Sequence, residues 1–349
     1  MRTIRLLSFG MLGTIGLAAV LTGAAATQPE TLTLADLVNR PDRWPATVTL
    51  PHDFRFNDGF TVHQGDPARV GLFDGTRVGL IAAGNHRFAA APADVGLLDA
   101  ANRAWAALTP AQRAVDPESL AADPSLWPVQ VSTTSPITCQ WGRLAEGTVV
   151  GLVSVTSHGP DVAWPNSPNR LNLNFGSTDV IARARHLALV APAQRPSRIA
   201  AALQAIMVDA DGRPYRDDHL GDKQFFALYF GASWCAPCHA FSPALVKYLD
   251  DALPKHPELA AVFLSDDKAL PPMFAYMKQE RMPIPAVPPQ AVSQSTLLTT
   301  YASQLIPQLV IVDRFGRVLA TSDDNHGNRI DPEETLGALT KLLAGQSAM

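Results

Sequence analysis

The sequence predicts an α/β domain in its C-terminal part, preceded by two small, mostly-β modules. From residue 198 onward, near-continuous apolar runs alternate with helical patterns, as in a sheet that carries helices on both faces. Before residue 190, short alternating apolar runs are broken by turn signals such as Asn57-Asp58-Gly59 and His158-Gly159. The predicted segments are the modules 27–100 and 127–190, a helical connector 101–126, a linker 191–197 and the α/β domain 198–349.

The composition is that of a globular protein. The chain has 349 residues, of which 47% are hydrophobic and 17% are charged, and its formal net charge is −4. These values do not fit a coiled coil, a disordered chain or a multi-span membrane protein. No long run of Lys and Arg is present to neutralise a phosphate backbone, so nucleic acid is not expected as a partner.

Residues 1–26 have the pattern of an export signal peptide. Arg2 and Arg5 precede an apolar stretch, 6–21, that is short for a bilayer span, and the small residues Ala24 and Ala26 fit a cleavage site. We therefore expect cleavage after Ala26 and a periplasmic or secreted protein. An uncleaved membrane anchor is the alternative, because the glycines in the apolar stretch weaken a spanning helix without forbidding it.

The two β modules look like weak copies of each other. Three marks recur in the same order: Trp-Pro at 44–45 and 127–128, Val-Gly-Leu at 70–72 and 150–152, and Asp-Val at 94–95 and 179–180. Short strands joined by tight turns predict small β-barrels of the SH3-like type. Between these barrels, apolar residues at helical spacing from Leu97 to Leu108 predict one or two helices up to Ala122.

The elements of the α/β domain follow in chain order. The patterns predict a helix 198–205, a hairpin 207–215, a buried strand 224–231, a helix from about 235 to 253, a buried strand 260–264, a helix 272–281, a hairpin of strands 309–312 and 318–321, and a last helix 332–343. Asp331 as N-cap and Pro332 at the first helical position mark the beginning of the last helix.

The cysteines carry the chemistry. Three are too few to stabilise a chain of this length by disulfides, and Cys139 is expected to be a buried or half-buried strand thiol. The run Ala232-Ser233-Trp234-Cys235-Ala236-Pro237-Cys238 follows a buried strand and opens a helix. Unpaired N–H groups and the dipole at the helix N-terminus favour a thiolate at Cys235, and Cys238 lies one turn further in, close enough to form a disulfide. This spacing predicts that Cys235 is a nucleophile and Cys238 its resolving thiol.

The motif Trp-Cys-Ala-Pro-Cys resembles the active site of the thioredoxin superfamily, and the resemblance covers residues 198–345. Pro243 lies where these proteins kink the active-site helix, and Ile306-Pro307 lies where they carry a cis-proline. The resemblance is strongest to tryparedoxin and nucleoredoxin, which have similar runs at the positions of 227–235, 263–267, 282–283 and 286–288.

The resemblance implies an exported thiol:disulfide oxidoreductase that reduces disulfides of partner proteins. Its redox group would be the Cys235–Cys238 pair itself, with no further cofactor and no metal. Trp234 and Pro237 would shape the motif and, together with Ile306 and Pro307, bind the substrate. A reductase outside the cytosol would need a membrane thiol carrier as its source of electrons.

Two positions depart from the family pattern. Tyr229 stands where thioredoxin has a buried acid, so the proton acceptor of Cys238 is unassigned. Gln308 follows the candidate cis-proline where threonine is usual, which leaves the details of substrate binding open.

Three alternatives compete with the dithiol interpretation. Residues 235–239 spell C-x-x-C-H, the attachment signature of c-type haem, in which His239 would bind the iron. Zinc at Cys235, Cys238 and His239 is a second alternative, although a second ligand pair is not evident. The third is a non-catalytic cell-envelope binding protein that uses its β modules. The strand before the motif and the Ile306-Pro307 pair favour the dithiol, which leaves His239 as an exposed helix residue.

Overall fold

The structure is a computed structural model that describes residues 30–165, 167–323 and 329–345. The described residues from Leu32 onward form one compact unit. The predicted signal peptide and its cleavage site after Ala26 lie outside the described residues. Within the described ranges, no helix combines the length and the apolar character needed to cross a membrane.

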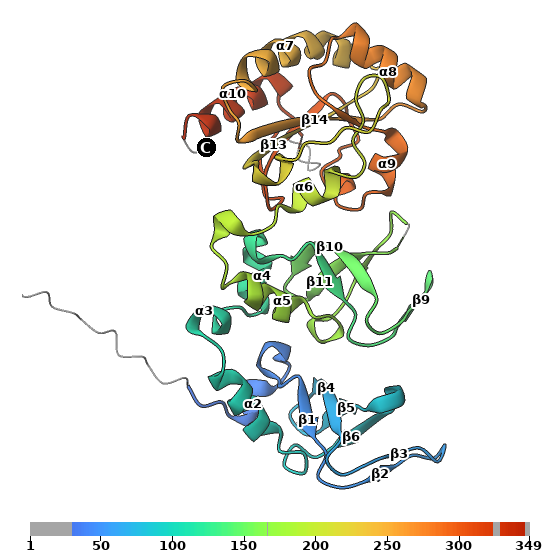
Figure 1. Cartoon of the computed structure of the whole chain (residues 1–349), viewed down its shortest axis with the longest axis vertical. Coiled ribbons are helices and arrows are strands. Elements are labelled where there is room, and N and C mark those ends of the chain that lie inside the picture. Colours follow the sequence, from blue (N-terminus) through green and yellow to red (C-terminus); the bar gives the residue numbers. More distant parts are fainter. Residues whose placement is uncertain (1–29, 166, 324–328, 346–349) are drawn as a thin grey trace, which may run out of the picture. The chain divides into compact units, whose positions relative to one another are not determined.

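The compact unit begins with a four-stranded antiparallel sheet of order β1-β4-β5-β6 (Figure 1). A separate two-stranded hairpin, β2-β3, lies between β1 and β4 in the sequence. The elements are α1 (Leu34–Leu37), β1 (Thr47–Thr49), β2 (Phe54–Arg55), β3 (Thr61–Val62), β4 (Pro67–Phe73), β5 (Val78–Ile81), β6 (Arg87–Ala90) and α2 (Leu97–Ala106).

A second set of elements follows with the same plan. Its sheet has the order β7-β10-β11-β12, and β8-β9 is again a separate hairpin. After the short helix α3 (Pro110–Arg113), the elements are α4 (Pro117–Ala122), β7 (Gln130–Ser132), β8 (Ile137–Cys139), β9 (Gly142–Leu144), β10 (Val149–Thr156), β11 (Gly159–Ala163), β12 (Arg170–Asn172) and α5 (Val180–Leu187).

These two sets are structural repeats, which supports the interpretation of the sequence marks. The indole Nε1 of Trp44 donates to the carbonyl of Leu37 at 2.7 Å, and the indole of Trp127 donates to the carbonyl of Leu120 at 2.6 Å. Both leucines are fully buried. We refer to the sets below as the first and second repeat.

One of the three recurring sequence marks, Val-Gly-Leu, does not occupy equivalent positions in the two repeats. Val70 pairs with Leu80 just before a bulge in β4, whereas Leu152 pairs with Val162 just before the bulge in β10. Val70 therefore corresponds to Leu152, and the two Val-Gly-Leu runs do not superpose. A bulge shifts the facing of every residue beyond it, so a three-residue match cannot fix register on its own.

The predicted SH3-like barrels are not confirmed. A closed barrel needs its first and last strands to pair, but β1 bonds only to β4 and β6 only to β5 in the first sheet. In the second sheet the outer strands β7 and β12 likewise have one partner each. The apolar face of the first sheet is covered instead by helix α2, whose Leu97 and Ala101 are fully buried in the same core.

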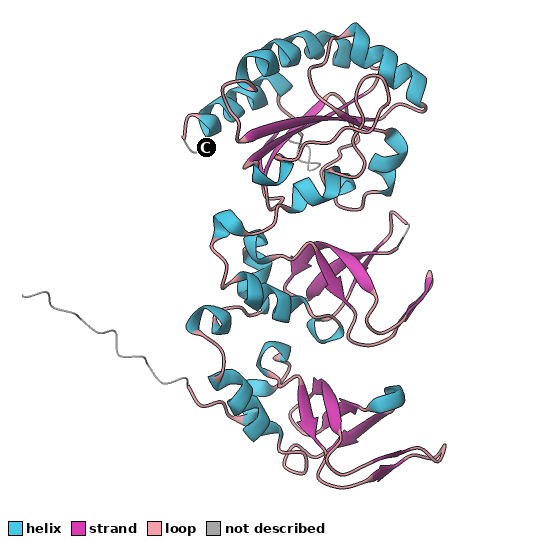
Figure 2. Cartoon of the chain, in the orientation of Figure 1, coloured by secondary structure: helices cyan, strands magenta, loops and turns pink. Residues whose placement is uncertain are grey.

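The α/β domain has a five-stranded sheet of order β15-β14-β13-β16-β17 (Figure 2). Strands β13, β14 and β15 are parallel to one another, and β16 is antiparallel to both of its neighbours, β13 and β17. Its elements are α6 (Arg198–Leu203), β13 (Phe225–Gly231), α7 (Ala236–Ala252), β14 (Leu259–Ser265), α8 (Leu270–Gln279), β15 (Ala286–Val287), α9 (Pro289–Gln294), β16 (Gln308–Asp313), β17 (Val318–Thr321) and α10 (Pro332–Leu343).

The central strand β13 is apolar throughout because both of its faces are buried. Ala227 and Tyr229 belong to a core shared with α7, α8 and α10, whereas Phe226 and Leu228 belong to a core shared with α6 and α9. Successive side chains of a strand point to opposite faces, so a strand between two helical layers has no polar side. This arrangement confirms the predicted α/β architecture of this part.

Four elements were not predicted: α1, α5, β15 and α9. The two residues of β15 pair with Phe263 and Leu264 of β14, a tertiary contact that leaves no periodic signal in so short a segment. Helix α9 begins at the second of two consecutive prolines, a pair that is typical of loops in a sequence. Helix α5 lies in a segment that was interpreted as part of a β module.

Two arginines of the α/β domain form hydrogen bonds with the parts of the chain that precede it: Arg198 with the second repeat and Arg314 with the predicted linker 191–197. The Arg198 guanidinium donates to the carbonyls of Leu152 and Val153 at 2.6 and 2.9 Å and lies 5.0 Å from the ring centroid of Trp127. Burial lowers the pKa of Arg198 to about 10. Arg314 donates to backbone carbonyls on both sides of the junction, those of residues 193, 195 and 221.

The equivalent leucines of the two repeats provide a test of this fold. We expect Leu37→Ala and Leu120→Ala each to lower the free energy of unfolding by about 2–5 kcal/mol, because each leaves a cavity in a fully buried core. Urea unfolding measures the loss, and Leu189→Ala, at a side chain that is 53% exposed, serves as the control with a change within about 0.5 kcal/mol. Losses as small as the control's for both leucines would contradict the repeat cores.

Candidate functional site

The two cysteines lie where the central strand ends and the longest helix begins. Strand β13 ends at Gly231, and Cys235 is the N-cap of α7, with Pro237 in its first turn. The sulfur of Cys235 accepts the backbone N–H of Cys238 at 3.1 Å. The sulfurs form a disulfide, with 5.2 Å between the two Cα atoms. Cys238 is fully buried and Cys235 is 4% exposed, so Cys235 is the more accessible sulfur.

The loop after β14 supports the residues before Cys235. The buried carboxylate of Asp267 accepts both the backbone N–H and the hydroxyl of Ser233, at 3.0 and 2.6 Å. The indole of Trp234 donates to the carbonyl of Asp266 at 3.3 Å, while 60% of the Trp234 side chain stays exposed. The carboxyl ends of parallel strands meet at one sheet edge, and these contacts fix the motif there.

The peptide bond between Ile306 and Pro307 is cis, as the resemblance implied. Pro307 directly precedes β16, whose first residue, Gln308, pairs with Phe230 near the end of β13. The register therefore places Pro307 at the same sheet edge as the cysteines. Ile306 is half-buried, so part of its side chain stays accessible there.

Gln308 has a structural role that explains its departure from the family pattern. Its amide nitrogen donates to the carbonyls of Tyr301 and Asp323 at 3.0 and 3.2 Å, and its amide oxygen accepts the N–H of Ser303 at 2.9 Å. The side chain is 1% exposed. Gln308 therefore ties the segment before Pro307 to the end of β17, a task for which threonine is too short.

A cluster of three hydroxyl groups stands where thioredoxin has a buried acid. The Tyr229 hydroxyl lies 3.2 Å from the Ser242 hydroxyl and 3.1 Å from the Tyr276 hydroxyl, and the last two are 2.6 Å apart. All three side chains are buried, and burial raises the pKa of both tyrosines above its ordinary value. The hydroxyls therefore stay protonated and offer hydrogen bonds without charge.

His239 is not the exposed helix residue that the sequence suggested. Its Nε2 lies 2.8 Å from the carbonyl oxygen of Ser233, and its Nδ1 lies 2.7 Å from the carboxylate of Glu280. Both partners are acceptors, so only the doubly protonated imidazolium satisfies both contacts. The bond to Ser233 and then the bond to Glu280 raise the pKa of His239. A positive charge is thus fixed beside the active-site turn.

Sequence reasoning missed Asp267 and Glu280 as parts of this site. Asp267 lies two residues beyond β14, in a run already quoted for its resemblance to tryparedoxin, so its position after a parallel strand was an available signal. Glu280 follows α8, and nothing in the sequence pairs it with His239. The third cysteine, Cys139, lies at the end of β8, half-buried and free.

Comparison with known proteins identifies the class of the C-terminal part. Residues 223–318 match the thioredoxin-like family. Over 114 residues the chain is 32% identical to probable nucleoredoxin 1 of Arabidopsis thaliana, a match that covers 32% of this chain and only 19% of that protein. The chain therefore carries a thioredoxin-like domain at its C-terminal end, which confirms the resemblance read from the motif.

Among solved structures, tryparedoxin I from Crithidia fasciculata is 28% identical, with a TM-score of 0.30, over 35% of this chain and 83% of that one. Thioredoxin from Wuchereria bancrofti is 26% identical, with a TM-score of 0.32, over 40% of this chain and 98% of that one. These similarities concern the C-terminal part.

The His239 contacts predict a pH dependence of stability. Because the folded state raises the pKa of His239, its contribution is fully present below the unfolded value of about 6.5 and is lost as the pH rises through the folded value. The loss of stability in His239→Gln should therefore be larger at about pH 5.5 than at about pH 8.5 in urea unfolding. His158→Gln, at an exposed turn of the second repeat, is the control. A loss independent of pH would contradict the imidazolium.

Proposed function

We propose that the protein is a thiol:disulfide oxidoreductase that reduces disulfides of partner proteins. The observation that carries this proposal is the Cys235–Cys238 disulfide at the N-terminus of α7, where the Cys235 sulfur accepts a backbone N–H. The same contact in the reduced protein favours the thiolate of Cys235, because a hydrogen-bond donor and the helix dipole both stabilise negative charge. Distant similarity to nucleoredoxin and tryparedoxin supports the proposal.

The reaction proceeds by two exchanges. The Cys235 thiolate attacks one sulfur of the substrate disulfide, forms a mixed disulfide and releases the other substrate sulfur as a thiolate, which takes up a proton. The Cys238 thiolate then attacks the Cys235 sulfur, releases the second substrate thiolate and leaves the Cys235–Cys238 disulfide. Two electrons pass from the protein to the substrate. Exposed Trp234 and the edge formed by Ile306 and Pro307 receive the substrate chain in this proposal.

Further parts of the proposal concern the cellular setting. Export is inferred from the signal-peptide pattern of residues 1–26, and an exported reductase requires a thiol carrier in the membrane to reduce its disulfide again. The direction of transfer rests on similarity to tryparedoxin. A non-catalytic binding protein is the second candidate, since the two repeats account for half of the chain.

The geometry favours the dithiol over the c-type haem alternative. Haem attachment would require both sulfurs in thioether bonds and a His239 nitrogen on the iron. In the structure the sulfurs are bonded to each other, and both ring nitrogens of His239 have protein partners. A Soret absorption band in the purified protein would overturn the dithiol interpretation.

The reduction potential of the Cys235–Cys238 pair decides the direction of transfer. We expect a value near −270 mV, as in thioredoxin, because a reductase needs a stable disulfide. Equilibration with glutathione or dithiothreitol buffers, followed by thiol alkylation, measures it. A value near −120 mV would identify an oxidant instead.

Trapping tests the two cysteine roles. With Cys238→Ser, the mixed disulfide at Cys235 cannot be resolved, so a covalent adduct with a disulfide-bonded protein such as insulin should accumulate. Cys235→Ser should form no adduct and lose turnover. Cys139→Ser, at the free thiol of β8, is the matched control and should reduce insulin at the wild-type rate. If the double variant of Cys235 and Cys238 keeps full cellular activity, the protein is a binding module.

A further inference from the structure

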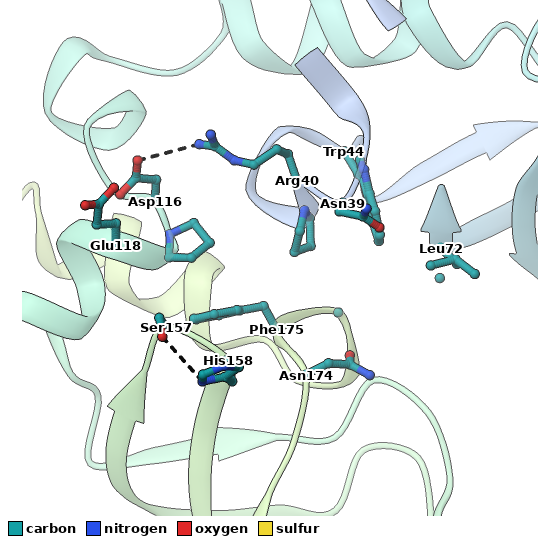
Figure 3. Close-up of a pocket in the computed structure, with 14 residues that line it drawn as sticks. Asn39, Arg40, Trp44, Leu72, Asp116, Glu118, Ser157, His158, Asn174 and Phe175 are labelled. Atoms are coloured by element: carbon teal, nitrogen blue, oxygen red, sulfur yellow. Dashed lines mark hydrogen bonds and ion pairs between the residues drawn. The ribbon is translucent and has the colours of Figure 1, made fainter. Parts of the chain in front are cut away.

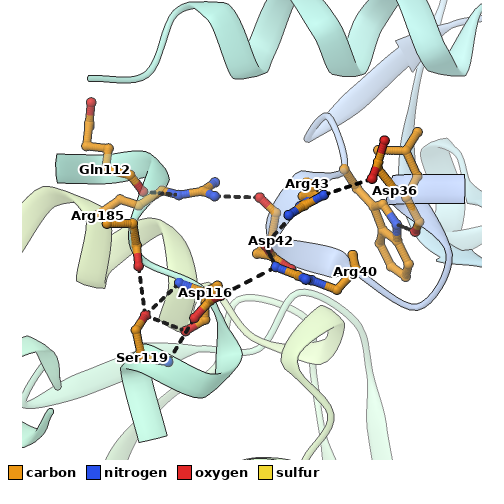
Figure 4. A network of polar contacts seen from close by, with 11 residues as sticks. Asp36, Arg40, Asp42, Arg43, Gln112, Asp116, Ser119 and Arg185 are labelled. Atoms are coloured by element: carbon orange, nitrogen blue, oxygen red, sulfur yellow. Dashed lines mark hydrogen bonds and ion pairs between the residues drawn. The ribbon is translucent and has the colours of Figure 1, made fainter. Parts of the chain in front are cut away.

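A cavity of about 360 Å³ lies between the first and second repeats, away from the dithiol. Its lining combines three arginines, Arg43, Arg69 and Arg185, with apolar side chains that include Trp105. Volumes of this size are typical of small-molecule sites. The charged groups around it belong to both repeats, and Figure 4 shows several of them.

Unpartnered polar atoms gather in this cavity. Among the described residues, three lining side chains have a buried polar atom without a hydrogen-bond partner: Nε of Arg43, Nη2 of Arg69 and Oγ1 of Thr178. Thr178 is only 5% exposed. Carboxylate oxygens lie near two of these atoms without forming a hydrogen bond: that of Asp42 is 3.9 Å from the Arg43 Nε, and that of Glu146 is 3.5 Å from the Arg69 Nη2. Leaving buried donors unsatisfied is costly, so the three atoms together favour a further acceptor in the cavity.

The carboxylates that line the cavity already have cations of their own outside it. Asp42 accepts two bonds from Arg40, at 2.9 and 2.8 Å (Figure 4). Asp179 accepts the side chain of Arg183 at 2.8 Å and the N–H of Ser132 at 2.7 Å. Asp42 also lies 3.9 Å from the Nε of Arg43, which lines the cavity and pairs with Asp36 at 3.3 Å. Both carboxylates of the lining therefore have cationic partners.

Arg185 and Arg69 are less well compensated than Arg43. Arg185 donates only to backbone carbonyls, those of Gln112 at 3.0 Å and Asp42 at 2.5 Å. Arg69 has a single carboxylate nearby, that of half-exposed Glu146 at 3.5 Å. Burial lowers the pKa of both arginines.

We propose that this cavity binds a small organic oxyanion, a carboxylate or a phosphate ester, through Arg43, Arg69, Arg185 and the hydroxyl of Thr178. Guanidinium groups match the planar or tetrahedral oxygens of such anions. Trp105, which lies 5.6 and 5.8 Å from the guanidinium carbons of Arg43 and Arg185, packs against the organic part. The proposal does not depend on the redox function.

A neighbouring cavity of about 450 Å³ does not have these features (Figure 3). It shares Trp44 and Phe175 with the first, and its lining includes Arg40 and Asp116, which form an ion pair at 3.5 Å. None of the buried unpartnered atoms found among the described residues belongs to its lining. The orphaned atoms therefore single out the smaller cavity.

Calorimetric titration of the full chain with citrate and, separately, with glycerol phosphate tests the proposal, with sodium chloride at matched ionic strength as the reference. At least one oxyanion should bind, and Arg69→Gln and Thr178→Val should each weaken it at least tenfold. Arg143→Gln removes an exposed charge of the second repeat and should leave the affinity unchanged. Insulin reduction should be the same in all variants.

The pattern of outcomes separates the sources of the anion. Binding of citrate alone identifies a carboxylate ligand, and binding of glycerol phosphate alone identifies a phosphate ester. If neither probe binds in the millimolar range, the proposal is overturned. Unchanged affinity in Thr178→Val, a variant that keeps the side-chain shape, would overturn it as well.

Discussion

The contact on which the redox site depends is the hydrogen bond from the backbone N–H of Cys238 to the sulfur of Cys235. An N-cap side chain normally supplies an oxygen to the first free N–H groups of a helix, and here a sulfur occupies that position. In the proposed oxidoreductase, the geometry that begins α7 therefore also favours negative charge on Cys235. Strand β13 ends just before this helix and positions its N-terminus at the sheet edge. The strand itself is held in place because its two faces pack into two hydrophobic cores.

Two different groups of side chains surround the dithiol: a neutral cluster of hydroxyl groups and a charged ion pair. Behind Cys238, the cluster of Tyr229, Ser242 and Tyr276 is neutral, because burial keeps both phenols protonated. The ion pair of His239 and Glu280 stands beside the turn, with the imidazolium bonded to the carbonyl of Ser233. A buried acid in place of Tyr229 would add negative charge behind the thiols, whereas the imidazolium adds positive charge next to them. The neutral cluster and the imidazolium therefore favour the thiolate over the thiol, whereas a buried acid would disfavour it.

The sequence predicted the α/β part well because its signals are local. Buried runs such as that of β13, the N-cap at Asp331 and the strand–motif–helix order around Cys235 each need only adjacent residues. What it missed depends on distant partners: β15 exists through its pairing with β14, and Glu280 acts on His239 across 41 positions of the chain. The prediction of closed barrels was not confirmed for a related reason. Alternation predicts strands and turns, but whether a sheet closes or is covered by a helix such as α2 is decided by the register of its outer strands.

Two buried arginines, Arg198 and Arg314, fix the junction between the second repeat and the α/β domain. Arg198 donates to carbonyls of both the second repeat and the α/β domain, and Arg314 donates to carbonyls of the segment 191–197 and of the α/β domain. A buried guanidinium has lost its hydration, so these carbonyls replace part of its contacts with water. Separating the second repeat from the α/β domain would break these hydrogen bonds and leave the carbonyl oxygens and the two guanidinium groups without their partners. The junction is therefore a specific interface and not a loose tether, so the position of the dithiol relative to the second repeat is part of the fold.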